Sequence, residues 1–272
     1  MKPSGIVTLT TDFGTIDPFA GQMKGAILFV HPQAVIIDIT HQITAHDILE
    51  GSFVLASSFS YFPAGTIHVA VVDPGVGSSR RGIAVQSGGH VFVGPDNGIF
   101  SGIFSQLGME RAVHITNQQY TRTMTGVTFH GRDIFAPVAA WLARGIDMTV
   151  LGPVVEDLVR LESIKPEIFG NRISGQVVYV DTFGNAITNI GKNLSDDVNK
   201  IVSDIRIKKR RVTMASHYEA ATGKTLNALF NSSGHLEIFV NKGRAADLYG
   251  IRRGDKVSIS LSPLQGNPLS GQ

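Results

Sequence analysis

The stretch of residues 67–77 constrains the fold more than any other part of the chain. Its first six residues are rich in β-branched side chains, which is typical of a buried strand. Asp73, Pro74 and Gly75 then end the strand, because proline cannot donate to a β-ladder and glycine accepts a positive φ. We therefore expect Asp73 at the carboxyl end of a central strand, the edge where open α/β sheets bind ligands. A simple surface turn is the alternative interpretation.

Strand-like and helical segments alternate through the first part of the chain. The spacing of apolar residues predicts strands at 6–10, 34–39, 67–72, 82–86, 90–94 and 112–115, helices at 19–30 and 47–61, and two more helices that end at 107 and 143. Asp47 is a candidate N-cap of the second helix. This order predicts an α/β domain with a central, mostly parallel sheet flanked by helices.

The pattern changes after about residue 149. Residues 151–171 contain four turn-forming residues and show weak periodicity, which is typical of a linker. Short strands follow, and we expect them at 175–180, 186–190, 201–207, 211–214, 226–230, 236–240 and 256–261. They predict an all-β barrel or sandwich. We therefore expect an α/β N-terminal domain over residues 1–165 and a barrel-like C-terminal domain over residues 166–272.

Composition and charge narrow the classes of partner. The net charge of +2 provides no broad field for nucleic acid or anionic membrane, and the basic cluster at 208–211 favours a solvated hairpin edge. The chain has no cysteine, which excludes disulfides and a cysteine nucleophile and fits a reducing compartment. We see neither a signal peptide nor an apolar run of about 18 residues, so we expect a cytoplasmic protein without membrane or nucleic-acid partners.

Three acids fall at the carboxyl ends of predicted strands: Asp12, Asp73 and Asp96, each two residues before a glycine. Together they predict a small-molecule site at one sheet edge, and a carboxylate there suits a ribose diol. His130 opens the last helix of the first domain. It is interpreted either as a capping or buried structural residue or as a polar group facing the same edge.

Familiar phosphate and metal motifs do not fit. The glycines after Asp73 lack the third glycine of a dinucleotide fingerprint, and a strand rather than a helix follows them. Gly223-Lys224-Thr225 resembles the end of a P-loop, but Tyr218 stands where the first glycine is required. No spacing supports a metal site, so we expect none. The residues by themselves therefore indicate a ligand site and leave the reaction open.

Five blocks of sequence, spread over nearly the whole chain, carry a family resemblance. The blocks are Thr10-Thr11-Asp12-Phe13-Gly14, Val72-Asp73-Pro74-Gly75-Val76-Gly77 with Arg80, Thr128-Phe129-His130-Gly131-Arg132-Asp133, Asp181-Thr182-Phe183-Gly184-Asn185, and Asn231-Ser232-Ser233-Gly234 followed by Asn241-Lys242-Gly243. In this order they resemble the S-adenosyl-L-methionine hydrolases, also called hydroxide adenosyltransferases. These enzymes are relatives of the bacterial fluorinating and chlorinating enzymes.

The resemblance implies a reaction and a catalytic set. The reaction is hydrolysis of S-adenosyl-L-methionine to adenosine and methionine, with the adenosyl compound as substrate and no cofactor. The catalytic Asp, Arg and His of the family fall on Asp73, Arg80 and His130. The halogenating relatives lack this charged trio, so its presence favours water over halide. Either Asp73 or His130 is then the proton acceptor.

The resemblance also implies how substrate binds. Asp12 would hold the ribose diol, and Asp181 and Asn185 would contact the amino-acid end or the ribose. Phe183 would form an apolar wall. The remaining expected contacts, near adenine or methionine, are Ser232, Ser233, Glu237, Val240 and the backbone of Ala245. Relatives usually carry Asn where this chain has Arg244. Relatives assemble as homotrimers, with the site between the N-terminal domain of one subunit and the C-terminal domain of the next.

The sequence also allows other functions. A non-catalytic protein that binds adenosine or adenosylmethionine would keep Asp12 and Asn185 without needing Arg80. A halide-dependent adenosyltransferase would release halogenated nucleoside. A metal-dependent hydrolase would lose its activity in chelator. Three measurements separate these possibilities: the activity of an Arg80→Ala variant, the products formed in halide buffer, and the activity in chelator.

Overall fold

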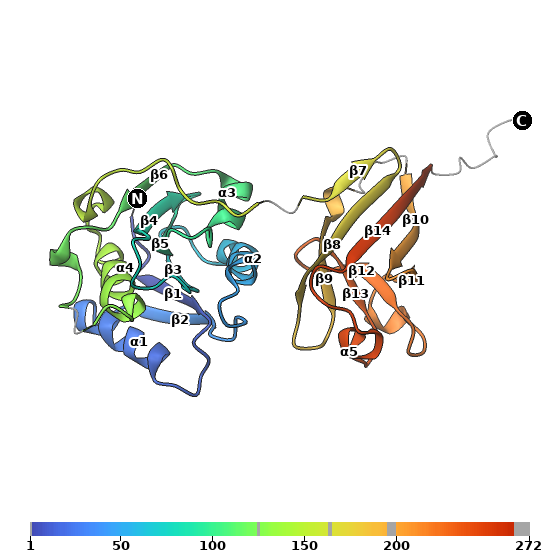
Figure 1. Cartoon of the computed structure of the whole chain (residues 1–272), viewed down its shortest axis with the longest axis horizontal. Coiled ribbons are helices and arrows are strands. Elements are labelled where there is room, and N and C mark those ends of the chain that lie inside the picture. The colour runs from blue at the N-terminus through green and yellow to red at the C-terminus, as the bar shows by residue number, and fades with distance from the viewer. Residues whose placement is uncertain (1, 124–125, 163–164, 195–199, 264–272) are drawn as a thin grey trace, which may run out of the picture. The chain divides into compact units, whose positions relative to one another are not determined.

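The computed structural model describes residues 2–123, 126–162, 165–194 and 200–263. The chain divides into two compact units, residues 1–162 and 163–272, whose elements are labelled in Figure 1. Within the described ranges, no helix combines the length and the apolar character that a membrane span requires.

A six-stranded sheet with the order β2-β1-β3-β5-β4-β6 forms the centre of the first unit (Figure 1). Its strands are β1 (Ile6–Thr11), β2 (Val35–Thr40), β3 (Ile67–Val71), β4 (Gly82–Ser87), β5 (His90–Pro95) and β6 (Arg111–His114). β1 pairs in parallel with β2 and β3, and β3 pairs in parallel with β5, whereas β4 is antiparallel to β5 and β6. The expected mostly parallel sheet is confirmed.

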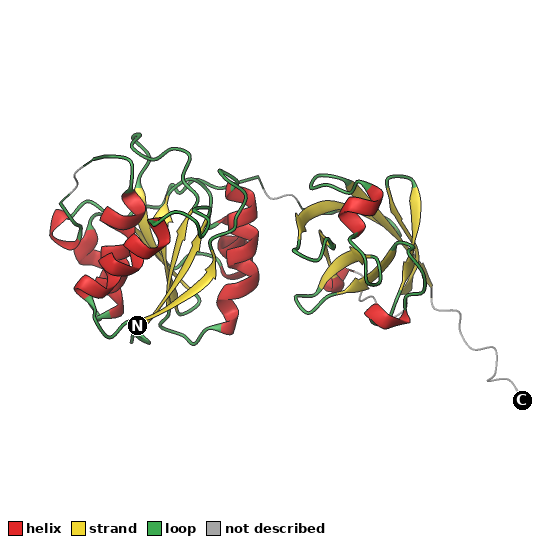
Figure 2. Cartoon of the chain, turned by 90° about the horizontal axis from the view of Figure 1, so that it is seen from below, coloured by secondary structure: helices red, strands yellow, loops and turns green. Residues whose placement is uncertain are grey.

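Helices cover both faces of this sheet, as Figure 2 shows. They are α1 (Phe19–Val30), α2 (Ile48–Ser58), α3 (Ser101–Leu107) and α4 (Ala136–Ala143), and a π-helical turn (Gly131–Phe135) leads into α4. α1 and α4 contribute to one hydrophobic cluster, and α2 and α3 contribute to another. Both sheet faces are therefore buried, which explains why the central strands read as continuous apolar runs.

The sequence anticipates the bounds of α1 and α2 closely. Asp47 caps α2, because its Oδ1 accepts a hydrogen bond from Glu50 N at 2.9 Å. A 3₁₀ turn at Phe59–Tyr61 then completes the helix expected over 47–61. Further 3₁₀ turns lie at Gln118–Tyr120, Met148–Leu151, Lys192–Leu194 and Tyr218–Ala220.

The second unit is a closed barrel. Its strands follow the order β14-β10-β11-β12-β13-β9-β8, and the pairing of β14 with β8 closes the ring. They are β8 (Arg172–Val180), β9 (Ala186–Gly191), β10 (Lys200–Ile207), β11 (Arg210–Met214), β12 (Asn227–Phe230), β13 (His235–Phe239) and β14 (Lys256–Pro263). Of the two expected architectures, the barrel is confirmed. Lys208 and Lys209 form the two-residue turn between β10 and β11, so the basic cluster lies on a hairpin as expected.

Two short elements escaped the sequence interpretation. β7 (Glu167–Phe169) pairs antiparallel with β8, and the helix α5 (Ala245–Tyr249) follows β13. Three and five residues are too few to establish a strand or helix period, and β7 is also flanked by Pro166 and Gly170.

The expectation of a linker over 151–171 is wrong for its first part. Val154 pairs with Val113 beside β6, and Leu158 is buried in the first unit. Arg81 Nη1 also donates to Asp157 Oδ1 at 2.7 Å. Tertiary partners thus hold a segment whose own sequence shows little periodicity.

Candidate active site

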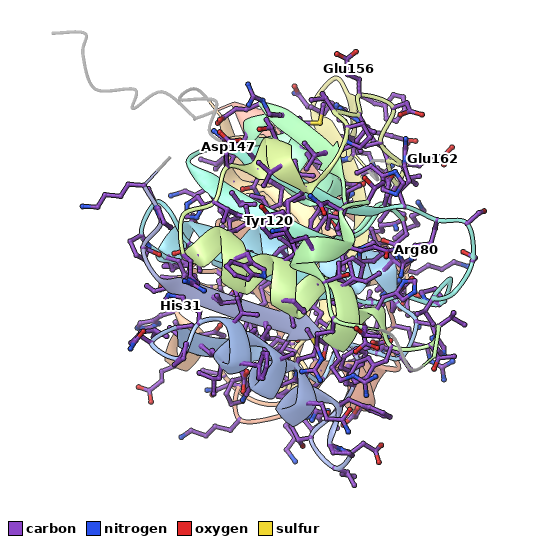
Figure 3. All side chains as sticks on the ribbon, turned by 90° about the vertical axis from the view of Figure 1, so that its left-hand side faces the viewer. His31, Arg80, Tyr120, Asp147, Glu156 and Glu162 are labelled. Carbon is purple, nitrogen blue, oxygen red and sulfur yellow. The ribbon has the colours of Figure 1, made fainter. Side chains whose placement is uncertain are left out.

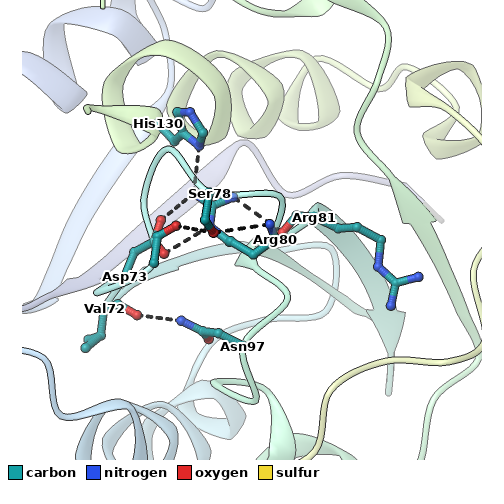
Figure 4. Close-up of polar contacts among 8 residues, drawn as sticks. Val72, Asp73, Ser78, Arg80, Arg81, Asn97 and His130 are labelled. Atoms are coloured by element: carbon teal, nitrogen blue, oxygen red, sulfur yellow. Dashed lines mark hydrogen bonds and ion pairs between the residues drawn. The ribbon is translucent and has the colours of Figure 1, made fainter. Parts of the chain in front are cut away.

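Asp73, Arg80 and His130 are in direct contact (Figure 4). Asp73 follows β3, Arg80 ends the loop that Asp73 begins, and His130 precedes the π-helical turn. Arg80 Nε donates to Asp73 Oδ1 at 2.9 Å, and Arg80 Nη2 donates to Asp73 Oδ2 and, at 2.7 Å, to His130 Nδ1. In Figure 3, Arg80 lies on the opposite side of the first unit from His31, the residue after α1. The structure therefore brings together the three residues of the expected catalytic set.

Local hydrogen bonds shape the loop that carries this trio. Ser78 Oγ donates to Gly75 O at 2.7 Å and accepts from Arg80 N at 3.3 Å. Asn97 Nδ2 donates to Val72 O at 2.8 Å, as Figure 4 shows. The backbone is thus held on both sides of the aspartate, and Asn97 is a supporting residue that the sequence interpretation missed.

The ion pair is nearly enclosed by protein. The side chain of Asp73 is 6% exposed and that of Arg80 is 11% exposed. The Arg80 guanidinium also lies 5.3 Å from the centre of the Phe135 ring. Buried charges need partners, and the two-pronged pairing supplies them while fixing the orientation of the guanidinium.

His130 is held in one protonation state by its neighbours. A guanidinium has only donors, so His130 Nδ1 must accept from Arg80, and the neutral ring then carries its proton on Nε2. Burial, together with the Arg80 cation, lowers the pKa of His130, although Asp73 and Asp133 act in the opposite direction. The neutral imidazole therefore predominates at pH 7.

A pocket of about 250 Å³ lies beside the trio, with Asp12, Asp73 and His130 in its wall. Three aromatic rings line the same pocket and pack edge to face, with centroids 5.4–5.9 Å apart: Phe13, Phe19 and Phe129. A mostly apolar wall with a few convergent polar groups is typical of a small-molecule site. Phe19, on α1, carries no motif that could have identified it from the sequence.

Asp12 lies directly after β1, and its Oδ2 accepts from His46 N at 2.9 Å. Among the described residues, none donates to Asp12 Oδ1, so this oxygen stays available to a ligand. His46 also lines the pocket. The sequence interpretation did not include it.

Asp96 does not belong to this pocket. Arg81 Nε donates to Asp96 Oδ2 at 2.8 Å, and Asp96 Oδ1 accepts from Val159 N at 2.9 Å. The expectation that Asp96 joins a three-acid ligand site is therefore wrong. Its buried carboxylate is neutralised by Arg81 and fastens residues 157–159 to the sheet.

A second pocket, of about 850 Å³, lies within the second unit. The expected binding residues in its wall are Asp181, Phe183, Asn185, Ser232, Glu237 and Val240. Ser233 and Ala245 are not in the wall. Ser233 N donates to Asn231 Oδ1 at 3.0 Å, and Ala245 is fully buried in the barrel core.

Asp181 organises the turn after β8. Its Oδ1 accepts from Phe183 N at 2.9 Å and from Asn185 N at 2.8 Å. The turn leaves the Phe183 side chain 74% exposed at the pocket. An aromatic ring presented on a hydrogen-bonded turn offers a flat apolar surface for another ring.

Glu237 is a buried residue in the wall of the second pocket. Its Oε1 accepts from Tyr218 Oη at 2.8 Å, and its Oε2 accepts from Asn231 Nδ2 at 3.1 Å. Burial, together with the hydrogen bond to Glu237, raises the pKa of Tyr218, so the phenol stays protonated. Tyr218 lines the pocket and was not anticipated, since no motif surrounds it.

The sequence models of two protein-family domains match this chain. Residues 7–152 match the SAM hydroxide adenosyltransferase N-terminal domain, and residues 175–258 match the SAM hydroxide adenosyltransferase C-terminal domain. The chain belongs to the SAM hydroxide adenosyltransferase family.

Similar proteins span nearly the whole chain. A Salinispora tropica protein named (R)-S-adenosyl-L-methionine hydrolase is 38% identical over 96% of this chain and 99% of its own length. A Methanocaldococcus jannaschii protein of the same name is 36% identical over 93% of this chain and 95% of its own. The crystal structure of an uncharacterized conserved protein from Thermotoga maritima has a TM-score of 0.87 and 34% identity, covering 94% of this chain and 99% of that one. Proteins named fluorinase are more distant, at 22–26% identity.

In this member of the SAM hydroxide adenosyltransferase family, Arg244 joins α5 to the 181–185 turn. Arg244 Nη1 donates to Thr182 O at 2.5 Å, and Arg244 Nε pairs with Asp247. Gly184 packs so closely on Arg244 that an added Cβ would lie 2.7 Å from Arg244 Cβ. Arg244 therefore supports the turn that presents Phe183.

The described part of the chain holds no group of three or more His, Asp or Glu side chains with the geometry of a metal site. In the wall of the first pocket, Asp73 and His130 are bonded to each other through Arg80.

Proposed function

We propose that this protein hydrolyses S-adenosyl-L-methionine to adenosine and L-methionine, with water attacking C5′ of the substrate. The observation that carries the proposal is the contact set of Asp73, Arg80 and His130 at a pocket that also contains Asp12. Membership of the SAM hydroxide adenosyltransferase family and near full-length relatives named hydrolases support the same activity.

The chemistry requires help for the nucleophile rather than for the leaving group. The sulfonium departs as neutral methionine, so no general acid is needed. Water is a weak nucleophile, with a pKa of about 15.7. The Arg80 cation, whose side chain is mostly shielded from solvent, would stabilise developing hydroxide.

Asp73 is the better candidate for the proton acceptor. The Nδ1 lone pair of His130 is occupied by Arg80, and its Nε2 carries the proton of the neutral ring. Each oxygen of Asp73 keeps a second lone pair beyond its bond to Arg80. We therefore assign Asp73 as acceptor of the water proton, which then passes to solvent, and His130 Nε2–H as a donor that orients the water.

Substrate binding would use both pockets. Asp12, with one oxygen available, suits the ribose diol beside the attacking water. The second pocket offers Phe183 as a surface for adenine, and Asp181, Asn185, Ser232 and Glu237 as polar groups. Holding the ribose on one side and the thioether end on the other aligns C5′ for backside attack.

We also propose a homotrimer in which the first pocket of one subunit faces the second pocket of the next. Exposed apolar side chains on the first unit support an interface there: Leu28 and Phe29 on α1, and Val35 and Ile37 on the edge strand β2. We further propose that the enzyme is cytoplasmic, in keeping with the absence of cysteine, and needs no cofactor.

The test is chromatography of the products after incubation with S-adenosyl-L-methionine. We expect equimolar adenosine and methionine, undiminished in chelator, and loss of product with Arg80→Ala. Unchanged substrate that stays tightly bound would instead establish a binding protein. Halogenated nucleoside in chloride or fluoride buffer would establish a halide-dependent adenosyltransferase.

A further inference from the structure

His46 occupies a backbone conformation that its side chain disfavours. It is the third residue of a turn closed by a hydrogen bond from Asp47 N to Thr44 O at 2.9 Å, and its φ is +68°. A positive φ at this position is ordinarily supplied by glycine or asparagine. Among the described residues, only three other non-glycine positions have a positive φ: Lys208, Lys209 and Lys242.

These other positions provide a contrast. Lys208 and Lys209 form the two-residue turn between β10 and β11, where a positive φ at both residues matches the twist of a hairpin. Lys242 lies in the second pocket and His46 lies in the first. A strained backbone conformation in the wall of a pocket indicates that the residue has a functional role there.

The turn places His46 in the wall of the first pocket. His46 N donates to Asp12 Oδ2 at 2.9 Å, which orients the carboxylate and leaves Oδ1 to a ligand. Glycine would keep this N–H and remove the strain, so the backbone bond alone does not account for the histidine. His46 lines the pocket together with Asp12, Asp73 and His130.

We propose that His46 is a substrate-binding residue: its imidazole hydrogen-bonds the sugar of the nucleoside whose diol Asp12 holds. A neutral imidazole offers one donor and one acceptor, which a sugar hydroxyl can use together. The turn therefore supplies two adjacent groups, a backbone-oriented carboxylate and a ring nitrogen, to the same sugar. This assignment rests on the proposed function, since it takes the substrate to be an adenosyl compound.

The experiment compares His46→Gly, His46→Asn and Lys209→Gly in the full-length protein. His46→Gly relieves the strain and keeps the bond to Asp12, so it removes only the imidazole, whereas asparagine tolerates the turn and restores a polar side chain. Lys209→Gly is the matched control, because it relieves a positive φ of +63° on a hairpin of the other unit. Adenosine affinity by calorimetry, KM and kcat for S-adenosyl-L-methionine, and thermal melting are measured for each.

We expect His46→Gly to melt no lower than the wild type while its adenosine Kd and its KM rise about tenfold, the effect of one lost hydrogen bond. We expect kcat to change much less, His46→Asn to recover most of the affinity, and Lys209→Gly to bind as the wild type does. Wild-type adenosine affinity in His46→Gly would overturn the assignment. If the wild type consumes no S-adenosyl-L-methionine but His46→Gly still weakens adenosine binding, the proposed reaction fails and the role of His46 stands.

Discussion

At the residue scale, Arg80 determines what its two partners can do. Its Nη2 bonds both Asp73 and His130, so one guanidinium sets the orientation of the carboxylate and the tautomer of the imidazole. The motif order identified these three residues before any geometry was known, because each lies inside a recognisable block. Phe19, His46 and Asn97 lie outside those blocks, and only the folded chain brings them to the site.

The pH dependence of the reaction follows from the same contacts. Burial and Arg80 lower the pKa of His130 from its ordinary value of 6.5, so the imidazole protonates only at a more acidic pH. Protonation removes the Nδ1 acceptor and places a cation against Arg80. We therefore expect kcat/KM to be constant around neutrality and to fall as the pH drops through a value below 6.5.

The control for this prediction is His130→Asn, which cannot titrate. It should lower kcat by about 100-fold, the usual cost of misplacing the attacking group, and should lose the acid limb assigned to His130. A limb centred above 6.5, or an identical limb in the variant, would contradict the assignment.

At the element scale, three strands of the first sheet are joined by a row of polar side chains. Thr8 on β1 bonds His68 Nδ1 on β3 at 2.8 Å, and His68 Nε2 bonds His90 Nδ1 on β5 at 3.1 Å. The row is buried against aromatic rings, of which Phe92 stacks on His68 with centroids 5.1 Å apart. The parallel register pairs Thr8 with His68 and pairs His68 with Phe92, two residues from His90, a proximity that the sequence pattern of one strand does not reveal.

This row makes the first unit sensitive to acid. Burial, and secondarily His90, lowers the pKa of His68 from 6.5 to about 3. Between these two pH values His68 binds a proton in the unfolded chain but not in the folded chain. The free energy of unfolding should therefore fall progressively as the pH drops from about 6.5 towards about 3. Denaturant unfolding at pH 7, 6, 5 and 4 measures this slope. His68→Gln should unfold more easily at pH 7 but show a shallower slope, and an unchanged slope would show that other groups cause the acid sensitivity.

The fit of β5 against β3 gives a test at the same scale. A Cβ at Gly94 would lie 2.3 Å from Ala70 O, a backbone atom that cannot move aside without separating the strands. We expect Gly94→Ala to lower the free energy of unfolding by about 2 kcal/mol or more.

Gly25→Ala is the matched control for Gly94→Ala. Gly25 lies on α1 with nothing within 4 Å of its added Cβ, so alanine should stabilise the helix by up to about 1 kcal/mol. Equal effects of the two changes in chemical denaturation would show that the close approach of β5 to Ala70 is not a constraint.

Sequence patterns predicted the longer elements well because each carries its own periodicity or cap, as Asp47 does for α2. They failed where partners distant in sequence decide the structure. The first part of the expected linker over 151–171 is held in the first unit by hydrogen bonds from Arg81 to Asp157 and from Val159 to Asp96. The helix α5 has five residues, which are too few to show a helical period. Asp96 was misassigned for the same reason, since its ion pair with Arg81 is invisible in the strand pattern.

At the scale of the whole molecule, the proposed catalytic residues and most of the proposed binding residues lie in different units. The charged trio and Asp12 belong to the α/β unit, whereas Phe183, Asn185 and Glu237 belong to the barrel. The homotrimer with shared sites is proposed from the family resemblance, and this division agrees with it.

The central claim is that Asp73 helps a water molecule attack C5′. Incubation with S-adenosyl-L-methionine in ¹⁸O-labelled water, followed by mass spectrometry of the products, tests it most directly, with Asp73→Asn as the isosteric control. We expect adenosine carrying one ¹⁸O at the 5′ position, unlabelled methionine, and almost no product from Asp73→Asn. Adenosine without the label, or equal labelling by Asp73→Asn, would contradict it.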